Sequence, residues 1–147
     1  MKRFECRWVR EPNPPAYAGK RLACSDDVIE VSKALLGDMP REVFLAWFLD
    51  GRHKILGYQA VHEGTGDVSL VDPGDVLTQV LLSGARAWIA VHNHPSGDPT
   101  PSPEDIALTG ALVRASKLVR RTLLDHIIVS DIGHTSLAAN GLMPSSD

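Results

Sequence analysis

The sequence predicts an α/β fold in which one mixed β-sheet is flanked by helices within a single domain. Apolar residues recur at helical spacing in some segments, and short runs rich in β-branched and aromatic residues lie between them. The two patterns alternate along the chain, which is typical of a sheet covered by helices. A length of 147 residues and a hydrophobic content of 44% suit one domain with its own core.

Residues 1–24 are predicted to form a Pro-rich arm, and residues 25–147 the folded domain. The run Glu-Pro-Asn-Pro-Pro at 11–15 lacks N–H donors at its prolines and favours an extended polyproline II conformation. We interpret the arm as solvated. A contact between its Lys and Arg residues and an acidic partner is the alternative.

The first predicted helix begins with Ser25, whose side chain can cap it. The acidic residues 26 and 27 complement the positive end of the helix dipole. Gly37 is predicted to end this helix. Before it, three apolar residues repeat at helical spacing: Val28, Val31 and Leu35.

Two strands are predicted next. Val43–Leu49 is nearly all apolar, as expected of a strand buried on both faces. Asp50-Gly51 is a turn signal, so Ile55–Val61 is expected to pair back as a second strand.

The next predicted unit is a helix followed by a strand. Asp72 is expected to cap the helix, with Pro73 in its first position. The strand, Ala87–Val91, ends at a pair of histidines. The apolar face of the helix includes Val76 and Val80, with Leu77 and Leu81 as further candidates.

The last predicted helix begins at Ser102-Pro103 and continues to about Val119. Strands at Leu123–Val129 and Thr135–Leu137 then complete the sheet. One face of the helix is apolar: Leu108, Leu112, Ala115 and Val119.

The histidines after the strand Ala87–Val91 are His92 and His94. In an extended backbone this spacing points both side chains to the same side, so two imidazole nitrogens can converge on one ion at about 2.0–2.1 Å. Asn93 is expected to point the other way. Prolines stiffen the loop that follows, and Gly97 permits a sharp reversal.

Asp105, three residues after Ser102, is expected to supply a third ligand. Its carboxylate can reach back over the helix start, where the helix dipole favours its charged form. Two imidazoles and a carboxylate suit zinc, and they leave a fourth tetrahedral position for water, as in catalytic sites. A structural interpretation also exists, because Ser102 and Asp105 have the spacing of a capping box.

A hydrolase of this kind also needs a general base within one water of the metal. The candidate is Glu42, at the start of the strand Val43–Leu49, although the residue pattern alone favours a solvated carboxylate at the strand edge. We interpret His126 as a packed, hydrogen-bonded structural residue. Orientation of a metal ligand is its alternative role.

The spacing of these residues resembles the JAMM signature of the MPN (JAB) metallopeptidase family. In that signature, His-x-His is followed after seven residues by serine and after two more by aspartate, with a glutamate upstream. The string His-Asn-His-Pro-Ser-Gly-Asp-Pro-Thr-Pro-Ser at 92–102 and the string Leu-Asp-His-Ile-Ile-Val at 124–129 resemble its RadC-like bacterial branch. The resemblance covers residues 25 to 143.

The resemblance implies a mixed sheet with flanking helices of the cytidine deaminase-like, JAB/MPN type. It implies one zinc ion bound by His92, His94 and Asp105, with water as the fourth ligand. It also implies that Glu42 is the general base and that Ser102 donates to the oxyanion.

These features favour a zinc-dependent metallopeptidase of JAMM type that hydrolyses a peptide or isopeptide bond. The alternative is a nucleic-acid-associated module with phosphodiester or non-proteolytic chemistry. A net charge of -3 and the lack of a dense basic stripe count against it. A non-catalytic scaffold is less favoured because the ligand set is complete. A zinc deaminase is excluded because its Pro-Cys-x-x-Cys half is missing.

The expected partner is a peptide or protein substrate, with substrate choice made by the loops around 62–71 and 96–101. We expect no membrane span, because no apolar stretch approaches about 18 residues. Cys6 and Cys24 lie in no Cys-x-x-Cys pair, and the N-terminus does not resemble a secretory signal. These features favour a cytoplasmic protein. The pattern makes no prediction of oligomeric state.

Overall fold

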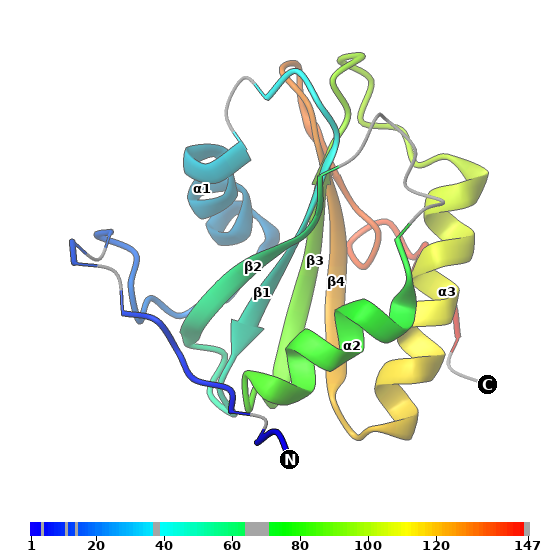
Figure 1. The fold of residues 1–147 in the computed structure, drawn as a ribbon. Helices are drawn as coiled ribbons and strands as arrows, with labels where there is room; N and C mark the ends of the chain where they lie inside the picture. Colours follow the sequence, from blue (N-terminus) through cyan, green and yellow to red (C-terminus); the bar gives the residue numbers. More distant parts are fainter. Residues whose placement is uncertain (4, 11, 14, 37–38, 64–70, 146–147) are drawn as a thin grey trace.

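The computed structural model describes residues 1–145 except 4, 11, 14, 37–38 and 64–70, and within them helices and strands alternate as predicted (Figure 1). The α/β class is therefore confirmed. Gly37, the predicted end of the first helix, lies outside the described residues. In chain order the elements are α1 (Ser25–Leu36), β1 (Val43–Leu49), β2 (Ile55–Glu63), α2 (Pro73–Leu82), β3 (Ala87–Asn93), α3 (Pro103–Leu118), β4 (Thr122–Val129) and β5 (His134–Ser136).

The strands form one mixed sheet in the order β2-β1-β3-β4-β5. β1 is antiparallel to both β2 and β3, β3 and β4 are parallel, and β5 is antiparallel to β4. The parallel pair is connected through α3, because parallel neighbours need a long crossover. Phe44 is paired with His92 across β1 and β3, so the beginning of β1 lies beside the end of β3.

Helices cover both faces of the sheet, α1 on one face and α2 with α3 on the other (Figure 1). Every residue of β1 and β3 is buried, which explains why both strands read as continuous apolar runs. Each face also contains a tryptophan that donates to a helix serine. Trp47 Nε1 donates to Ser32 Oγ (2.9 Å), and Trp88 Nε1 donates to Ser116 Oγ (3.0 Å).

The start of α1 differs from the prediction by one residue. The helix begins at Ser25, so this serine is its first residue rather than its cap. The carboxylate of Asp27 satisfies the preceding backbone instead, by accepting the N–H groups of Ala23 (2.9 Å) and Cys24 (3.4 Å). Asp27, in the acidic first turn, therefore provides part of the capping that was predicted for Ser25.

The capping of α2 is confirmed. Asp72 accepts the N–H groups of Gly74 (2.6 Å) and Asp75 (3.2 Å). Of the two further candidates for its buried face, Leu77 is buried but Leu81 is 43% exposed. Leu81 directly follows the fully buried Val80, and one position along a helix turns a side chain about 100° around the axis.

The N-terminal arm is exposed over most of its described length, as interpreted, but it returns to the domain at several points. Leu22 is buried in the core beneath α1, and Tyr17 packs edge-on against Trp47 with ring centroids 5.7 Å apart. Trp8 lies so close to Gly57 of β2 that a Cβ at this glycine would be 2.6 Å from Trp8 Cζ3. The glycine therefore makes room for the arm.

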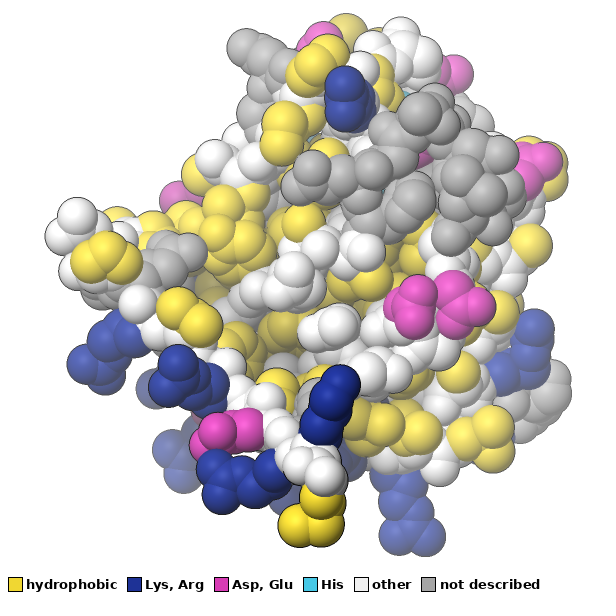
Figure 2. All heavy atoms as spheres, in the orientation of Figure 1, with side chains coloured by type: hydrophobic (Ala, Val, Ile, Leu, Met, Phe, Trp, Pro, Cys, Tyr) yellow, Lys and Arg dark blue, Asp and Glu magenta, His cyan; other side chains and the backbone are white. Residues whose placement is uncertain are grey.

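Lys and Arg side chains are unevenly distributed on the face that Figure 2 shows. Most of them lie in the lower half, and one lies near the top, the end of the view at which β3 ends (Figure 1). Cys6 and Cys24 are both free and exposed. Among the described residues, no helix is both long enough and apolar enough to span a membrane.

Candidate metal centre

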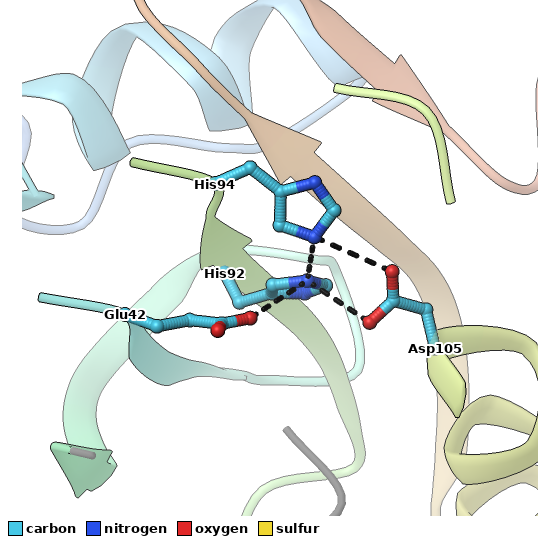
Figure 3. A group of neighbouring side chains, drawn as sticks. All are labelled: Glu42, His92, His94 and Asp105. Carbon is cyan, nitrogen blue, oxygen red and sulfur yellow. Dashed lines mark hydrogen bonds and ion pairs between the residues drawn. The ribbon is translucent and has the colours of Figure 1, made fainter. Parts of the chain in front are cut away.

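Three elements deliver four metal-ligating side chains to one point at the upper edge of the sheet (Figure 3). His92 lies near the end of β3 and His94 directly follows that strand. Asp105 lies in the first turn of α3. Glu42 precedes β1, and the pairing of Phe44 with His92 brings it to this edge. The ligand-type atoms of the four side chains all lie within 4.8 Å of one another.

The three predicted ligands form a compact triangle. His92 Nε2 is 2.9 Å from His94 Nε2 and 3.2 Å from Asp105 Oδ1, and His94 Nε2 is 3.3 Å from Asp105 Oδ2. Ligand atoms that surround a tetrahedral zinc ion at about 2.0–2.1 Å lie about 3.3 Å apart. The observed separations match this value to within about 0.4 Å, so the three side chains fit an ion of that size.

His94 is oriented by the loop that follows it. Its Nδ1 lies 2.8 Å from the carbonyl oxygen of Asp98, and a carbonyl only accepts, so Nδ1 donates the hydrogen. In the neutral ring Nε2 then has a lone pair, and it is this atom that faces Asp105. Gly97, in the same loop, has φ +91°, a conformation that favours glycine, so the predicted reversal is confirmed.

Asp105 takes part in the capping box, and its carboxylate also lies beside both histidines, as the predicted ligand role requires. Ser102 caps α3, and the two residues form the capping box: Asp105 N–H donates to Ser102 Oγ (3.1 Å), and Ser102 N–H donates to Asp105 Oδ2 (2.7 Å). The carboxylate also faces both imidazoles. A single side chain therefore fixes the helix start and contributes to the cluster.

The electrostatics of the cluster couple acid and imidazole. Burial alone would raise the pKa of Asp105, but its interactions with the rings of His92 and His94 outweigh burial and hold that pKa well below its usual range. In turn, the bond to Asp105 raises the pKa of His94, although burial opposes this effect. Without an ion, a proton on His94 stabilises the pair, and a cation would have to replace that proton.

Glu42 is closer to the cluster than a solvated edge residue would be. Its side chain is only 12% exposed, and Oε1 lies 3.6 Å from His92 Nε2. The residue pattern favoured a solvated carboxylate because periodicity along one strand gives no information about which strand lies beside it. The pairing of β1 with β3 supplies that information.

Asn93 was not identified as a functional candidate from the sequence. It points away from the histidines, as expected, and it binds the backbone on both sides of Glu42. Asn93 Oδ1 accepts the N–H of Val43 (2.7 Å), and Nδ2 donates to the carbonyl oxygen of Arg41 (2.9 Å). One buried amide between the two histidines therefore ties the strand with the imidazoles to the segment with the carboxylate.

His126 is fully buried and hydrogen-bonded, as interpreted, and one of its partners is a predicted ligand. Its Nε2 lies 2.8 Å from His92 Nδ1, and its Nδ1 lies 2.6 Å from Thr109 Oγ1. Burial lowers the pKa of His126 well below its usual value, so the ring is neutral. Thr109 is a second residue that the sequence analysis missed. The signal was its position four residues after Asp105, on the same helix face.

A cavity of about 390 Å³ opens beside His94. The loop at 96–101, expected to contribute to substrate choice, is not among its lining residues, and most of the other loop, 64–70, lies outside the described residues. The cavity lies instead between the end of α1, the residues after β3 and the end of β4. Its lining is mixed: Lys33, Leu36, Met39, Asn93, His94, Pro95, Val129, Ser130 and Asp131.

A mixed sheet between two helical layers, with a His, His, Asp and Glu cluster at its edge, defines an α/β domain with a candidate metal centre. The family model described as RadC-like JAB domain matches residues 22–142. The chain therefore belongs to the RadC-like JAB domain family, and the resemblance predicted from the histidine loop is confirmed.

Two similar curated proteins have the name UPF0758 protein. The chain is 40% identical over 129 residues to a UPF0758 protein of Desulforamulus reducens, and this match covers 88% of the chain and 57% of the relative. It is 39% identical over 137 residues to a UPF0758 protein of Syntrophotalea carbinolica, covering 93% of the chain and 59% of the relative. The chain thus spans somewhat more than half the length of these relatives.

Proposed function

We propose that this domain is a zinc-dependent hydrolase of JAMM type that cleaves a peptide or isopeptide bond. The observation that carries the proposal is the triangle of His92, His94 and Asp105, whose separations suit zinc, with the carboxylate of Glu42 beside it. Nitrogen and oxygen donors of this kind are those that catalytic zinc sites use. Membership of the JAB family, which includes hydrolases, supports the assignment.

Zinc bound at this position would supply a Lewis acid that polarises a carbonyl and makes a water acidic enough to lose a proton near neutral pH. Glu42 accepts that proton as the water oxygen bonds to the carbonyl carbon. The carboxyl group of Glu42 then donates the proton to the departing amine as the C–N bond breaks. Asn93 holds the backbone on both sides of Glu42, which limits the positions that the base can take.

Ser102 is proposed to stabilise the oxyanion. Its oxygen accepts the N–H of Asp105, which leaves the hydroxyl hydrogen to donate. The carbonyl oxygen gains negative charge as the water oxygen bonds to the carbonyl carbon, so a fixed donor favours the transition state over the ground state.

Of the cluster, only His94 lines the cavity, so we propose that the cavity binds a flanking part of the peptide substrate rather than the scissile bond. The lining of the cavity combines apolar side chains with backbone and polar groups, which suits a peptide segment with one side chain inserted. On the face that Figure 2 shows, most Lys and Arg side chains lie in the lower half. A phosphodiester substrate, the alternative, favours a site with several cations, and Lys33 is the one Lys or Arg side chain among the described residues that line the cavity.

The test measures zinc content and cleavage of a peptide library for wild type and Glu42→Gln. We expect Glu42→Gln to retain zinc and to lose about 10²–10⁴-fold in turnover, the usual contribution of a general base. Glu104→Gln is the matched control, because it makes the same change at an exposed carboxylate of the first turn of α3 and leaves turnover unchanged. Full activity of Glu42→Gln would refute the role of the base, and loss of zinc would make Glu42 a ligand.

A chelator separates peptide hydrolysis from other interpretations. Cleavage that stops with chelator and returns with added zinc supports the proposal. Salt-dependent binding of duplex or single-stranded DNA, without cleavage of any peptide, would favour the nucleic-acid alternative instead.

A further inference from the structure

A chain of buried hydrogen bonds runs behind His92, on the side away from the other ligands. His92 Nδ1 lies 2.8 Å from His126 Nε2, His126 Nδ1 lies 2.6 Å from Thr109 Oγ1, and Thr109 Oγ1 donates to the carbonyl oxygen of Asp105 (2.6 Å). Each of the three side chains is 0% exposed. The chain therefore links β3, β4 and α3, and it ends on the backbone of the third ligand.

The direction of each hydrogen bond follows from the last acceptor. A carbonyl oxygen only accepts, so the single hydrogen of the Thr109 hydroxyl points to Asp105. The hydroxyl oxygen then accepts, and Nδ1 of His126 must donate to it. A neutral imidazole has one N–H, so Nε2 of His126 accepts from Nδ1 of His92. In the neutral ring of His92, Nε2, which faces the cluster, then has the lone pair.

We propose that His126 and Thr109 are positioning residues, which hold His92 in the tautomer with hydrogen on Nδ1 and so direct its Nε2 lone pair to a divalent cation. Phe44 fixes the planes of both rings, because it stacks on His92 (centroids 6.4 Å apart) and meets His126 edge-on (5.6 Å). The tautomer is a property of the metal-free protein. Only the use of the lone pair for zinc rests on the proposed function.

The first measurement is a long-range ¹H–¹⁵N spectrum of the histidine rings in the metal-free wild-type protein. We expect His92 to have its hydrogen on Nδ1 and His126 to have its hydrogen on Nδ1. A hydrogen on Nε2 of His92 would overturn the proposal. This measurement needs neither a variant nor a substrate.

The second measurement is zinc affinity, by competition with a chromophoric chelator, for wild type, His126→Phe and His126→Gln. Phenylalanine removes the acceptor for His92 Nδ1, and we expect affinity to fall about 10–100-fold, the usual cost of losing the partner of a metal ligand. Glutamine keeps an acceptor oxygen and should restore part of that loss. Thr109→Val, which removes the acceptor one bond further away, should have a smaller effect.

Ser32→Ala is the control, because it removes a fully buried hydrogen bond on the other face of the sheet. It should lower thermal stability without changing zinc affinity. If folded His126→Phe binds zinc as tightly as wild type, His126 is only structural and the proposal is overturned. If wild type has the predicted tautomer but binds no zinc, the tautomer assignment is supported and the proposed function fails.

Discussion

Two buried aspartates of this protein, Asp105 and Asp125, have opposite surroundings although both are nearly inaccessible (1% and 9% exposed). Asp105 faces two imidazoles, and its interactions with them outweigh burial and lower its pKa. Asp125 faces neutral groups only, and burial raises its pKa. Its donors are the Ser136 hydroxyl (2.5 Å), the His126 N–H (2.8 Å) and the Ala138 N–H (2.9 Å).

The difference separates a closed polar cluster, the groups around Asp125, from an open one, the groups around Asp105. The donors around Asp125 come from β4, from the last residue of β5 and from the turn after β5, and they satisfy the carboxylate without any added group. Around Asp105, the ring nitrogens and carboxylate oxygens converge on a common point, and their charge balance depends on a proton or a cation. In this protein the buried carboxylate with a lowered pKa, Asp105, is therefore the functional candidate, because its partners are side chains of a type that can bind a metal.

The largest expected effect comes from Asp105→Ala. It removes one of three ligands, so zinc affinity should fall by more than the roughly 100-fold that loss of a ligand's partner can cost. Competition with a chelator measures this. Ser102→Ala separates the capping role, because it removes the cap bond and leaves the carboxylate in place. It should cost about 1 kcal/mol of unfolding free energy and leave zinc affinity in the same order of magnitude.

Substitution of Asp125 by alanine should have the opposite pattern, with a large effect on stability and a small effect on zinc affinity. Asp125→Ala leaves several buried donors without an acceptor, so the free energy of unfolding should fall by roughly 3 kcal/mol. Zinc affinity of the folded protein should stay within about tenfold of wild type, since the hydrogen bond of Asp125 to His126 involves the backbone N–H and not the ring. Urea unfolding and zinc competition measure the two quantities. A larger loss of zinc affinity than for Asp105→Ala would contradict the distinction.

The sequence predicted the open cluster better than the contacts that support it. His92 and His94 were found because their spacing has a fixed meaning in a strand, and Asp105 because helix starts have a recognisable pattern. The position of Glu42 depends on which strands are neighbours, and periodicity along one strand contains no such information. The resemblance to a family supplied it instead.

The supporting residues were missed for a similar reason. Asn93 was expected only to point away from the histidines, because its partners belong to a segment some 50 residues earlier in the chain. Thr109 left a weak signal, since Asp105, Thr109, Leu112 and Ser116 recur at helical spacing and form a partly polar stripe on a buried face. The closed cluster of Asp125 depends on a turn after β5, which has no periodic pattern.

A smaller effect is expected at Asn93, which binds the backbone on both sides of Glu42. Asn93→Ala leaves the buried N–H of Val43 without its acceptor, which should cost about 1–3 kcal/mol of unfolding free energy. Amide exchange at Val43 should accelerate, while zinc affinity stays close to that of wild type because both imidazoles remain. Unchanged exchange at Val43 would show that Asn93 does not hold the segment that contains Glu42.

The smallest effects concern pH, and here the two aspartates should differ in sign. Asp105 has a lowered pKa in the folded state, so its contribution to stability is present above about pH 4 and is lost as the pH falls. Asp125 has a raised pKa, so its contribution is complete below about pH 4 and declines as the pH rises through the raised value. His94 behaves like Asp125 but above its ordinary pKa of about 6.5.

Urea unfolding of chelator-treated protein from about pH 3 to 9 tests these signs, where one unit of pKa shift corresponds to about 1.4 kcal/mol. Asp105→Asn should reduce the loss of unfolding free energy at acid pH. It should also reduce the loss above about pH 6.5, because the bond to Asp105 is the main cause of the raised pKa of His94. Asp125→Asn should leave both of these losses unchanged, and it should remove the decline in unfolding free energy just above about pH 4. If both variants change the pH dependence of the unfolding free energy below about pH 6 in the same direction, the surroundings of the two carboxylates are not opposite.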